Sequence, residues 1–290
     1  MIDPELLEKL VAFQKYGTLS ATADHLLVTQ PTVTRSMKKL EEQLGVALFD
    51  RSISNRIKLN DTGVLAATEA QKLLQAHQDF EKRIQNFAHQ QSELQIGGVM
   101  PGPSIFATTL QPEITVKFTV DFQPLAPEAV VDELLAYKKH LIFVNDELNN
   151  SEIESMYLGV ERLGVALDNF NPLAQHASVS FKELAGLSFL VGQNIGPWRS
   201  LIEDCIPNAN FLYQEKFTAV NELSKYSNFP FFFSNLSKLS KPTATRFSPS
   251  RTKVMIEDPN NAMEVYGAYR KQDRHLVQPL LKNLAQKWPQ

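Results

Sequence analysis

The sequence has little of the chemistry that marks a secreted protein, a membrane protein or a redox enzyme. Its 290 residues include a single cysteine, Cys205, which excludes an internal disulfide framework. No apolar run reaches the roughly 18 residues that a membrane-spanning helix needs. The acidic start, Met1 to Glu5, lacks the pattern of a secretory signal peptide, so we expect a cytoplasmic protein.

Patterns for metal binding and catalysis are also missing. The histidines are scattered instead of grouped at ligand spacing, and we expect no metal site; they are His25, His77, His89, His140, His176 and His275. Neither GxxxxGK[ST] nor GxGxxG occurs, and residue order supports no Ser-His-Asp arrangement. The acidic neighbours of Cys205 favour a structural role for this thiol over a redox one. We therefore expect neither an enzyme nor a cofactor.

Length and composition favour two globular domains. The chain is 43% hydrophobic and 21% charged, with a net charge of −3 that does not suggest a nucleic-acid-binding protein. The charge is unevenly spread, however. From Leu27 to Lys58 we count six Lys or Arg against three acids. Such a local basic face can hold phosphate while the acidic remainder limits non-specific binding.

The stretch from Gly17 to Arg56 predicts a helix-turn-helix. Each of two short helical patterns has one apolar face, formed by Leu19, Ala23 and Leu26, and by Val33, Met37, Leu40 and Leu44. The joint at 27–29 is so short that the helices must cross. Thr29 or Gln30 can cap the second helix, and Gly45 can end it. By spacing alone, a helical hairpin with a solvated basic face is an equal alternative.

The outer face of the second helix carries side chains that can read base edges or hold phosphate in a major groove. We expect base contacts from Gln30, Thr32 and Arg35, at the helix end that enters the groove. We expect phosphate or minor-groove contacts from Thr34, Lys38, Arg51 and Arg56. The last two stand with Lys58 on a predicted two-stranded wing. The full predicted DNA-binding set is Thr29, Gln30, Pro31, Thr32, Thr34, Arg35, Lys38, Arg51 and Arg56.

This stretch resembles the winged helix-turn-helix of the LysR-type transcriptional regulators. The matching positions are Gln30-Pro31, Leu40-Glu41, Leu44-Gly45, and Leu48-Phe49 followed by Arg51. Threonine replaces the usual alanine at position 22 and the usual serine at positions 29 and 34, which keeps the hydrogen-bonding capacity at the last two. The resemblance implies a regulator that binds double-stranded DNA and responds to a small-molecule effector.

A long helix is predicted from about Gly63 to Gln90, capped by Asn60 or Thr62. Apolar side chains recur along it at spacings of three and four, and form a seam: Ala66, Ala70, Leu73, His77, Phe80, Ile84 and Phe87. A lone helix with such a seam needs a partner, which predicts a homodimer. The alternative is a helix packed on its own domain. A homotetramer is implied only by the family resemblance.

The remainder of the chain alternates short strands and helices, which predicts an α/β fold with a largely parallel sheet. Expected strands are 94–97, 116–120, 141–144, 163–167, 188–191, 211–214, 229–233 and 254–256. Expected helices are 126–137, 198–205, 219–226 and 276–288.

This half is similar to the effector-binding domain of the same family, which resembles periplasmic binding proteins. The matching residues are Leu94-Gln95-Ile96-Gly97, Pro172-Leu173-Ala174, and Phe181 with Leu184-Ala185-Gly186. The resemblance implies a DNA-binding domain at 1–62, a dimerisation helix at 63–91 and an effector domain at 92–290. It further implies two subdomains, 92–161 with 267–290, and 162–266, with a ligand cleft between them.

Two segments depart from the family pattern. Residues 100–113 are short and hold three prolines where the family has a helix, and the aromatic run 228–233 replaces a glycine-rich turn. Because ligands bind outside the carboxyl ends of parallel strands, we expect a cleft with a small, partly apolar acid. The predicted effector-binding residues are Met100, Ser104, Phe122, Gln123, Gly192, Gln193, Asn194 and Phe229. The alternative is a closed cleft that Phe229 and Phe231 fill.

A second function class remains from the residues alone. The α/β half could be a solute-binding or enzymatic domain, with the N-terminal helices as a dimerisation module. The missing signal peptide argues against a solute-binding protein, and the missing catalytic cluster argues against an enzyme.

Overall fold

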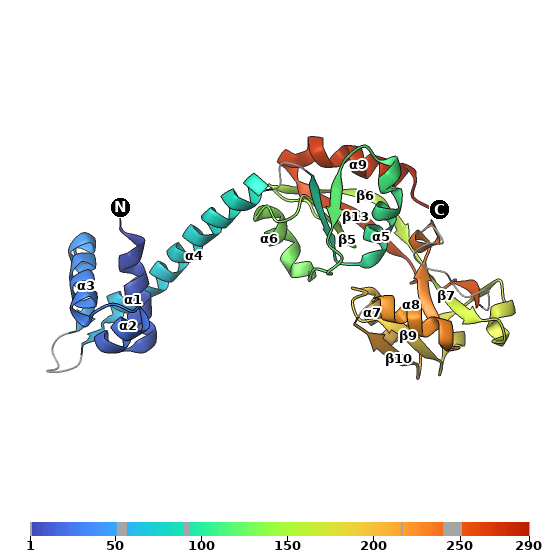
Figure 1. Ribbon diagram of the computed structural model, residues 1–290, viewed down its shortest axis with the longest axis horizontal. Coiled ribbons are helices and arrows are strands. Elements are labelled where there is room, and N and C mark those ends of the chain that lie inside the picture. The colour runs from blue at the N-terminus through green and yellow to red at the C-terminus, as the bar shows by residue number, and fades with distance from the viewer. Residues whose placement is uncertain (1, 51–56, 90–92, 216, 240–250, 290) are drawn as a thin grey trace. The chain divides into compact units, whose positions relative to one another are not determined.

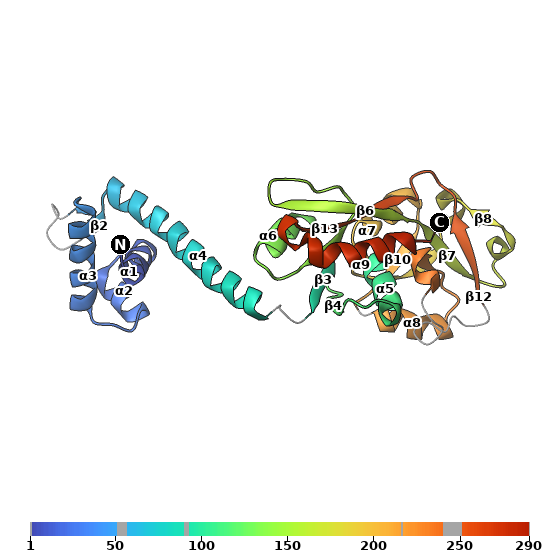
Figure 2. The ribbon, with the colours of Figure 1, turned by 90° about the horizontal axis from the view of Figure 1, so that it is seen from above.

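The computed structural model describes residues 2–50, 57–89, 93–215, 217–239 and 251–289. It forms two compact units, which divide between Gln85 and Asn86 (Figures 1 and 2). In the described part of the chain, no helix is long and apolar enough to cross a membrane.

The first unit is a small helical domain with a wing. Its helices are α1 (Pro4–Tyr16), α2 (Leu19–His25), α3 (Gln30–Leu44) and the start of α4 (Asp61–His89). Strands β1 (Phe49–Asp50) and β2 (Lys58–Leu59) pair antiparallel and form the base of the expected wing. The core includes the predicted apolar residues Ala23, Val33, Met37 and Leu40, together with Leu6, Leu7, Leu10, Phe13, Leu48 and Phe49. Leu44 differs, because 38% of it is exposed.

The predicted caps of these helices are confirmed. The Thr29 side chain accepts a hydrogen bond from the Thr32 N–H at the start of α3. Gly45 ends α3 with φ +72°, a left-handed conformation that suits glycine. The Asn60 side-chain oxygen accepts from the Gly63 N–H at 2.8 Å and so caps α4. These local bonds fix where each helix begins or ends.

The apolar seam of α4 has two parts. Ala70 is buried in the core of the first unit, and Ala66 packs against that core. Farther along, Leu73, Phe80 and Ile84 are 57%, 62% and 57% exposed. The alternative of packing against the helix's own domain therefore holds for the first turns only. Leu73, Phe80 and Ile84 are uncovered, whereas Phe87 at the end of the seam contacts Tyr137, with the ring centroids 5.6 Å apart.

The second unit contains two sheets, and the first has the strand order β4-β3-β5-β13-β6. Its strands are β3 (Leu94–Gly98), β4 (Phe118–Val120), β5 (Leu141–Val144), β6 (Ile153–Glu161) and β13 (Met263–Arg270). Its helices are α5 (Pro101–Leu110), α6 (Val130–Leu135) and α9 (Arg274–Gln286), and short 3₁₀ turns are Gln111–Glu113, Pro127–Ala129 and Lys271–Asp273. Strands β3, β4 and β5 are parallel, whereas β13 runs antiparallel to β5 and β6.

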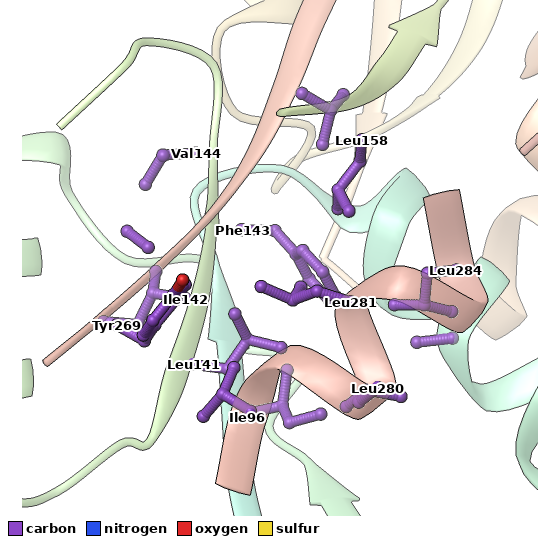
Figure 3. Close-up of a cluster of buried hydrophobic side chains, with 14 of the residues drawn as sticks. Ile96, Leu141, Ile142, Phe143, Val144, Leu158, Tyr269, Leu280, Leu281 and Leu284 are labelled. Atoms are coloured by element: carbon purple, nitrogen blue, oxygen red, sulfur yellow. The ribbon is translucent and has the colours of Figure 1, made fainter. Parts of the chain in front are cut away.

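All four residues of β5 are buried, because both faces of this central strand are covered. Leu280, Leu281 and Leu284 of α9 lie on one side, with Leu141 and Phe143 (Figure 3). Ile142 and Val144 point to the other side (Figure 3). Figure 2 shows α9 lying along this sheet.

The second sheet has the order β10-β9-β11-β7-β12-β8. Its strands are β7 (Leu163–Asp168), β8 (Ser178–Val179), β9 (Ser188–Gly192), β10 (Asn210–Gln214), β11 (Phe231–Ser234) and β12 (Arg251–Ile256). Its helices are α7 (Trp198–Cys205) and α8 (Phe217–Tyr226), and its 3₁₀ turns are Pro172–Gln175, Phe181–Leu184 and Leu236–Leu239 (Figure 1). Alternating residues of β9 serve two cores: Phe189 and Val191 face α7, and Leu190 packs with Val220 of α8.

Several expectations differ from this structure. Both sheets are mixed, and strands β6, β8 and β13 were not recognised from the pattern. Residues 101–110 form a helix despite their prolines, because Pro101 and Pro103 lie in its first turn, where the missing N–H groups have no intrahelical partner. Strand β13 already pairs with β6 at Met263, so the chain re-enters the first sheet four residues before the expected position 267.

Two buried asparagines hold the crossings between the sheets. The Asn261 side chain accepts from the Leu163 N–H at 3.0 Å and donates to the Leu163 and Ile256 carbonyls at 2.9 and 2.6 Å. The Asn235 side chain accepts from the Arg162 N–H at 2.9 Å and donates to the Val160 carbonyl at 3.0 Å. At these crossings, backbone N–H and C=O groups that no longer pair with a neighbouring strand thereby find hydrogen-bond partners away from water.

Asn261→Ala should destabilise the second unit by about 3 kcal/mol, because three buried backbone groups lose their partner at once. Urea denaturation of the full chain, followed by circular dichroism, measures this loss. Asn260→Ala is the matched control, since the neighbouring Asn260 is exposed and should matter little. Equal stability of the two variants would contradict the role of Asn261.

Candidate functional site

The first candidate site is the outer face of α3. Gln30, Pro31, Thr34, Arg35 and Lys38 line one shallow hollow of about 600 Å³ on this face. The side chains Val33, Met37 and Leu40 are buried on the opposite face of the helix. One helix therefore presents an apolar face to its core and a polar, basic face to the solvent, as a recognition helix must.

Local hydrogen bonds order the start of this face. The Ser20 hydroxyl of α2 donates to the Gln30 side-chain oxygen at 3.0 Å. That bond leaves the Gln30 amide N–H groups directed to donate elsewhere. The Thr29 and Thr32 hydroxyls lie 2.8 Å apart and share a hydrogen bond, and the Thr34 hydroxyl donates to the Gln30 carbonyl at 3.0 Å.

The basic side chains on this face are free to bind an anion. Arg35, Lys38 and Lys39 are exposed, and none of them forms an ion pair with another described residue. Unpaired cations on a solvated surface keep their full attraction for phosphate. Arg51 and Arg56, which were predicted to bind DNA from the wing, lie outside the described residues.

The second candidate site is a pocket between the two subdomains of the second unit. It has a volume of about 430 Å³. Val99 and residues 124–127 line it from the first subdomain, and Gln193, Asn194, Gly196 and Pro197 line it from the second. The lining is mostly apolar, with two side-chain amides, which is the composition of a small-molecule site.

Only part of the predicted effector-binding set reaches this pocket. Gln193 and Asn194 line it, as expected from the carboxyl end of β9. Met100 and Ser104 are 1% and 2% exposed, so their side chains belong to the core beneath it. The others lie outside the lining: Phe122, Gln123, Gly192 and Phe229.

The aromatic run after residue 228 does not fill the cleft in this structure. Phe231 packs in the core with Leu190 and Val220, and Phe229 is 41% exposed. The Phe229 carbonyl accepts a hydrogen bond from Arg251 at 2.8 Å. The alternative of a cleft closed by Phe229 and Phe231 is therefore wrong.

A buried carboxyl group lies at the end of β6, against the indole of Trp198. Glu161, at the end of β6, is 2% exposed, and one of its oxygens accepts from the Trp198 indole N–H at 3.1 Å. The Ser234 hydroxyl also bonds it. Burial raises the pKa of Glu161 despite these two bonds, because no cation among the described residues pairs with it.

Sequence reasoning missed Ser20, Glu161, Val99 and the residues 124–127. Their positions depend on contacts between distant segments, which one sequence does not reveal. The only available signal was the cluster of prolines at 124 and 127, a turn pattern directly after an expected strand. Among the described residues, no group of three His, Cys, Asp or Glu side chains is placed to bind a metal ion.

Comparison with known proteins assigns both regions to one family. Residues 4–64 match the family model described as "Bacterial regulatory helix-turn-helix protein, lysR family". Residues 111–221 match the model described as "LysR substrate binding domain". The chain belongs to the LysR family. It is therefore a helix-turn-helix transcriptional regulator with an effector-binding domain.

Individual relatives agree with this assignment. This chain is 24% identical over 213 residues to the uncharacterised regulator YybE of Bacillus subtilis, and the match covers 71% of this chain and 72% of YybE. It is 26% identical over 213 residues to BbuR of Bordetella bronchiseptica, and the match covers 72% of this chain and 65% of BbuR.

Solved structures share the fold of the whole chain. A full-length OxyR variant from Pseudomonas aeruginosa has a TM-score of 0.55 at 17% identity, covering 98% of this chain and 95% of that one. DarR of Vibrio fischeri has a TM-score of 0.57 at 15% identity, covering 98% and 99%.

Glu161→Gln should change stability in a pH-dependent way. A carboxyl group whose pKa is raised by folding stabilises the protein below its ordinary value of 4.5, and this contribution is lost as pH rises through the raised value. Glutamine does not ionise, so the variant should gain stability relative to wild type over the pH range above the ordinary value of 4.5. Urea denaturation across this range measures the difference.

Glu154→Gln on the same strand is the control with the opposite sign. The hydrogen bond from Arg274 holds the pKa of Glu154 below its usual range, so this carboxylate stabilises the fold above that range. The variant should lose stability relative to wild type as pH rises. Parallel pH profiles for the two variants would contradict the buried, unpaired state of Glu161.

Proposed function

We propose that this LysR-type regulator reads its operator with the outer face of α3, dimerises through α4 and binds an effector in the pocket between its subdomains. The observation that carries the DNA-binding part is the exposed basic face of α3, whose Arg35 and Lys38 form no ion pair with another described residue, opposite a buried apolar face. We assign it a binding function, not a catalytic one, exercised in the cytoplasm, where a bacterial operator is found.

Roles on α3 follow from position and chemistry. Gln30, Thr32 and Arg35 lie on the N-terminal half of the helix and are assigned to base edges. Thr34 and Lys38 are assigned to phosphates, which fix the register of the protein on the duplex. Thr29 and Pro31 shape the start of the helix. Arg51 and Arg56 remain predicted phosphate or minor-groove contacts.

The structure of DarR was determined in complex with DNA, which supports a DNA-bound role for a chain of this fold. The alternative of a solute-binding or enzymatic domain with a helical dimerisation module gains no such support. Ser20 adds a positioning role, since its hydroxyl orients the Gln30 amide toward the solvent.

Dimerisation is assigned to the uncovered part of the α4 seam. Leu73, Phe80 and Ile84 follow one another at spacings of seven and four along one helix face. Three large apolar side chains exposed in a row would lose solvent-accessible area if a second copy packed against them. A tetramer through the α/β units stays a prediction that only the family resemblance carries.

Arg35→Ala should weaken binding to the specific operator by about 1–3 kcal/mol and relax one base preference, because a base-edge contact is lost. Lys38→Ala should weaken specific and non-specific binding alike and lower the slope of log affinity against log salt by about one unit. Fluorescence anisotropy with DNA from the upstream intergenic region measures both. Unchanged operator affinity in Arg35→Ala, with a wild-type salt slope in Lys38→Ala, would contradict the assignment.

A double substitution, Leu73→Glu with Phe80→Glu, should convert the dimer to a monomer at micromolar concentration, because it places charges in an apolar interface. Sedimentation velocity of the full chain measures the oligomeric state. Lys82→Glu changes charge on the opposite side of α4 and should leave the dimer intact. A dimer that survives the double substitution would refute the seam as the interface.

A further inference from the structure

The last turn of α4 rests on the end of α6, and both belong to the second unit. The rings of Phe87 and Tyr137 meet edge to face, with their centroids 5.6 Å apart and their planes at 87°. The Asn86 side-chain amide donates to the Ala136 carbonyl at 2.9 Å. Ala136 is the C-cap of α6, where helical carbonyls have no donor within the helix. A ring contact and a hydrogen bond thus join these two helix ends.

Tyr137 occupies a backbone position that is unusual for its side chain. Its φ is +56°, the left-handed conformation for which glycine is the usual residue after a helix. The turn itself is a Schellman motif, because the Lys138 N–H donates to the Glu133 carbonyl at 3.1 Å. A tyrosine is strained at such a position, and this strain points to a use for its ring.

The neighbours of Tyr137 hold its ring to the end of α6. The Arg270 guanidinium lies over the ring, 4.2 Å from the centroid, and the Gln272 side-chain amide donates to the hydroxyl at 2.7 Å. Arg270 is 4% exposed and also donates to the Leu134 carbonyl in the last turn of α6. Because one buried guanidinium contacts both the helix end and the ring, the ring follows any shift of that helix end.

The other end of α6 leads into the effector pocket. Ala126 and Pro127 line this pocket. The 3₁₀ turn that begins at Pro127 is held by the Ala129 N–H, which donates to the Ala126 carbonyl at 3.0 Å, and α6 follows it without a break. Residues 127–135 are therefore one continuous helical segment, with the pocket at its start and the contact with α4 just beyond its end.

We propose that the segment 127–135 transmits the occupation of the pocket to α4, with Tyr137 as the positioning residue at the receiving end. A short hydrogen-bonded helix shifts as a unit, so a ligand that displaces Pro127 displaces the Tyr137 ring as well. Phe87 is 53% exposed, so a small shift suffices to loosen its contact. This inference rests on the proposed binding of an effector in the pocket.

Tyr137→Gly separates the function of the ring from that of the turn. Glycine suits the left-handed position, so the end of α6 should persist while the contact with Phe87 is lost. In hydrogen–deuterium exchange of the full chain, the amides of residues 84–89 should exchange about fivefold faster than in wild type, and those of 130–136 at the wild-type rate.

Two further variants of the same residue control this measurement. Tyr137→Phe retains the ring and should restore the wild-type exchange of residues 84–89. Tyr137→Asn, which also tolerates the left-handed conformation, should repeat the effect of glycine if the glycine variant does not fold.

A bulky side chain placed in the pocket tests the transmission itself. Asn194 is exposed and lines the pocket from the second subdomain, so Asn194→Trp brings an indole toward the turn at Pro127. It should change the exchange of residues 84–89 by about twofold or more, and the change should vanish in the Tyr137→Gly background. Asn210→Trp adds the same side chain at an exposed position outside the pocket lining and should have no effect.

Three results would overturn the proposal: wild-type exchange of residues 84–89 in Tyr137→Gly, no change caused by Asn194→Trp, or an equal change with and without the tyrosine ring. These measurements need neither DNA nor a ligand. A chain that shows the coupling but binds no operator in a gel-shift assay would refute the proposed DNA reading by α3 and leave the role of Tyr137 standing.

Discussion

The second unit depends on satisfying polar groups where its chain passes twice between two sheets. Each passage takes backbone N–H and C=O groups out of one ladder before they enter the next, and an unpaired buried group costs about 1–3 kcal/mol. Asn235 and Asn261 supply the missing partners from side chains that are 7% and 1% exposed. Trp288 adds a further bond, from its indole N–H to the Val160 carbonyl at 3.0 Å. These bonds fix the end of β6, where the chain leaves the first sheet.

The first unit depends on a different constraint, the burial of one face of each helix in a small core. Its small core must bury one face of each helix, and for α3 this leaves the opposite face in solvent. On the exposed face, Arg35, Lys38 and Lys39 form no ion pair with another described residue, so these charges do not stabilise the helix through pairing. In a DNA-binding protein the same cations release counterions on binding and so supply affinity. Folding of the inner face and recognition by the outer face are thus two consequences of one amphipathic pattern.

How much the sequence predicted depended on whether the signal was local. Thr29, Gly45 and Asn60 act within a few residues, and their caps were recognised; β5 and α7 were bounded to the residue. Strand β6 was missed because its apolar residues, Ile153, Met156, Leu158 and Val160, do not alternate regularly with polar ones from its start. Helix α5 was missed because three prolines in 100–113 suggested a loop. Glu161 was missed because its partners are 37 and 73 residues away. The structure brings them together through packing that no spacing reveals.

The central claim is that the face of α3 recognises a particular DNA sequence as part of a symmetric dimer. Selection of binding sites by the purified chain from a random pool of duplex DNA tests this most directly. The account predicts enrichment of one motif with approximate two-fold symmetry, its half-sites about one or two helical turns apart. Enrichment should disappear in Arg35→Ala. A pool that gains no motif, or a motif that Arg35→Ala recovers unchanged, would contradict it.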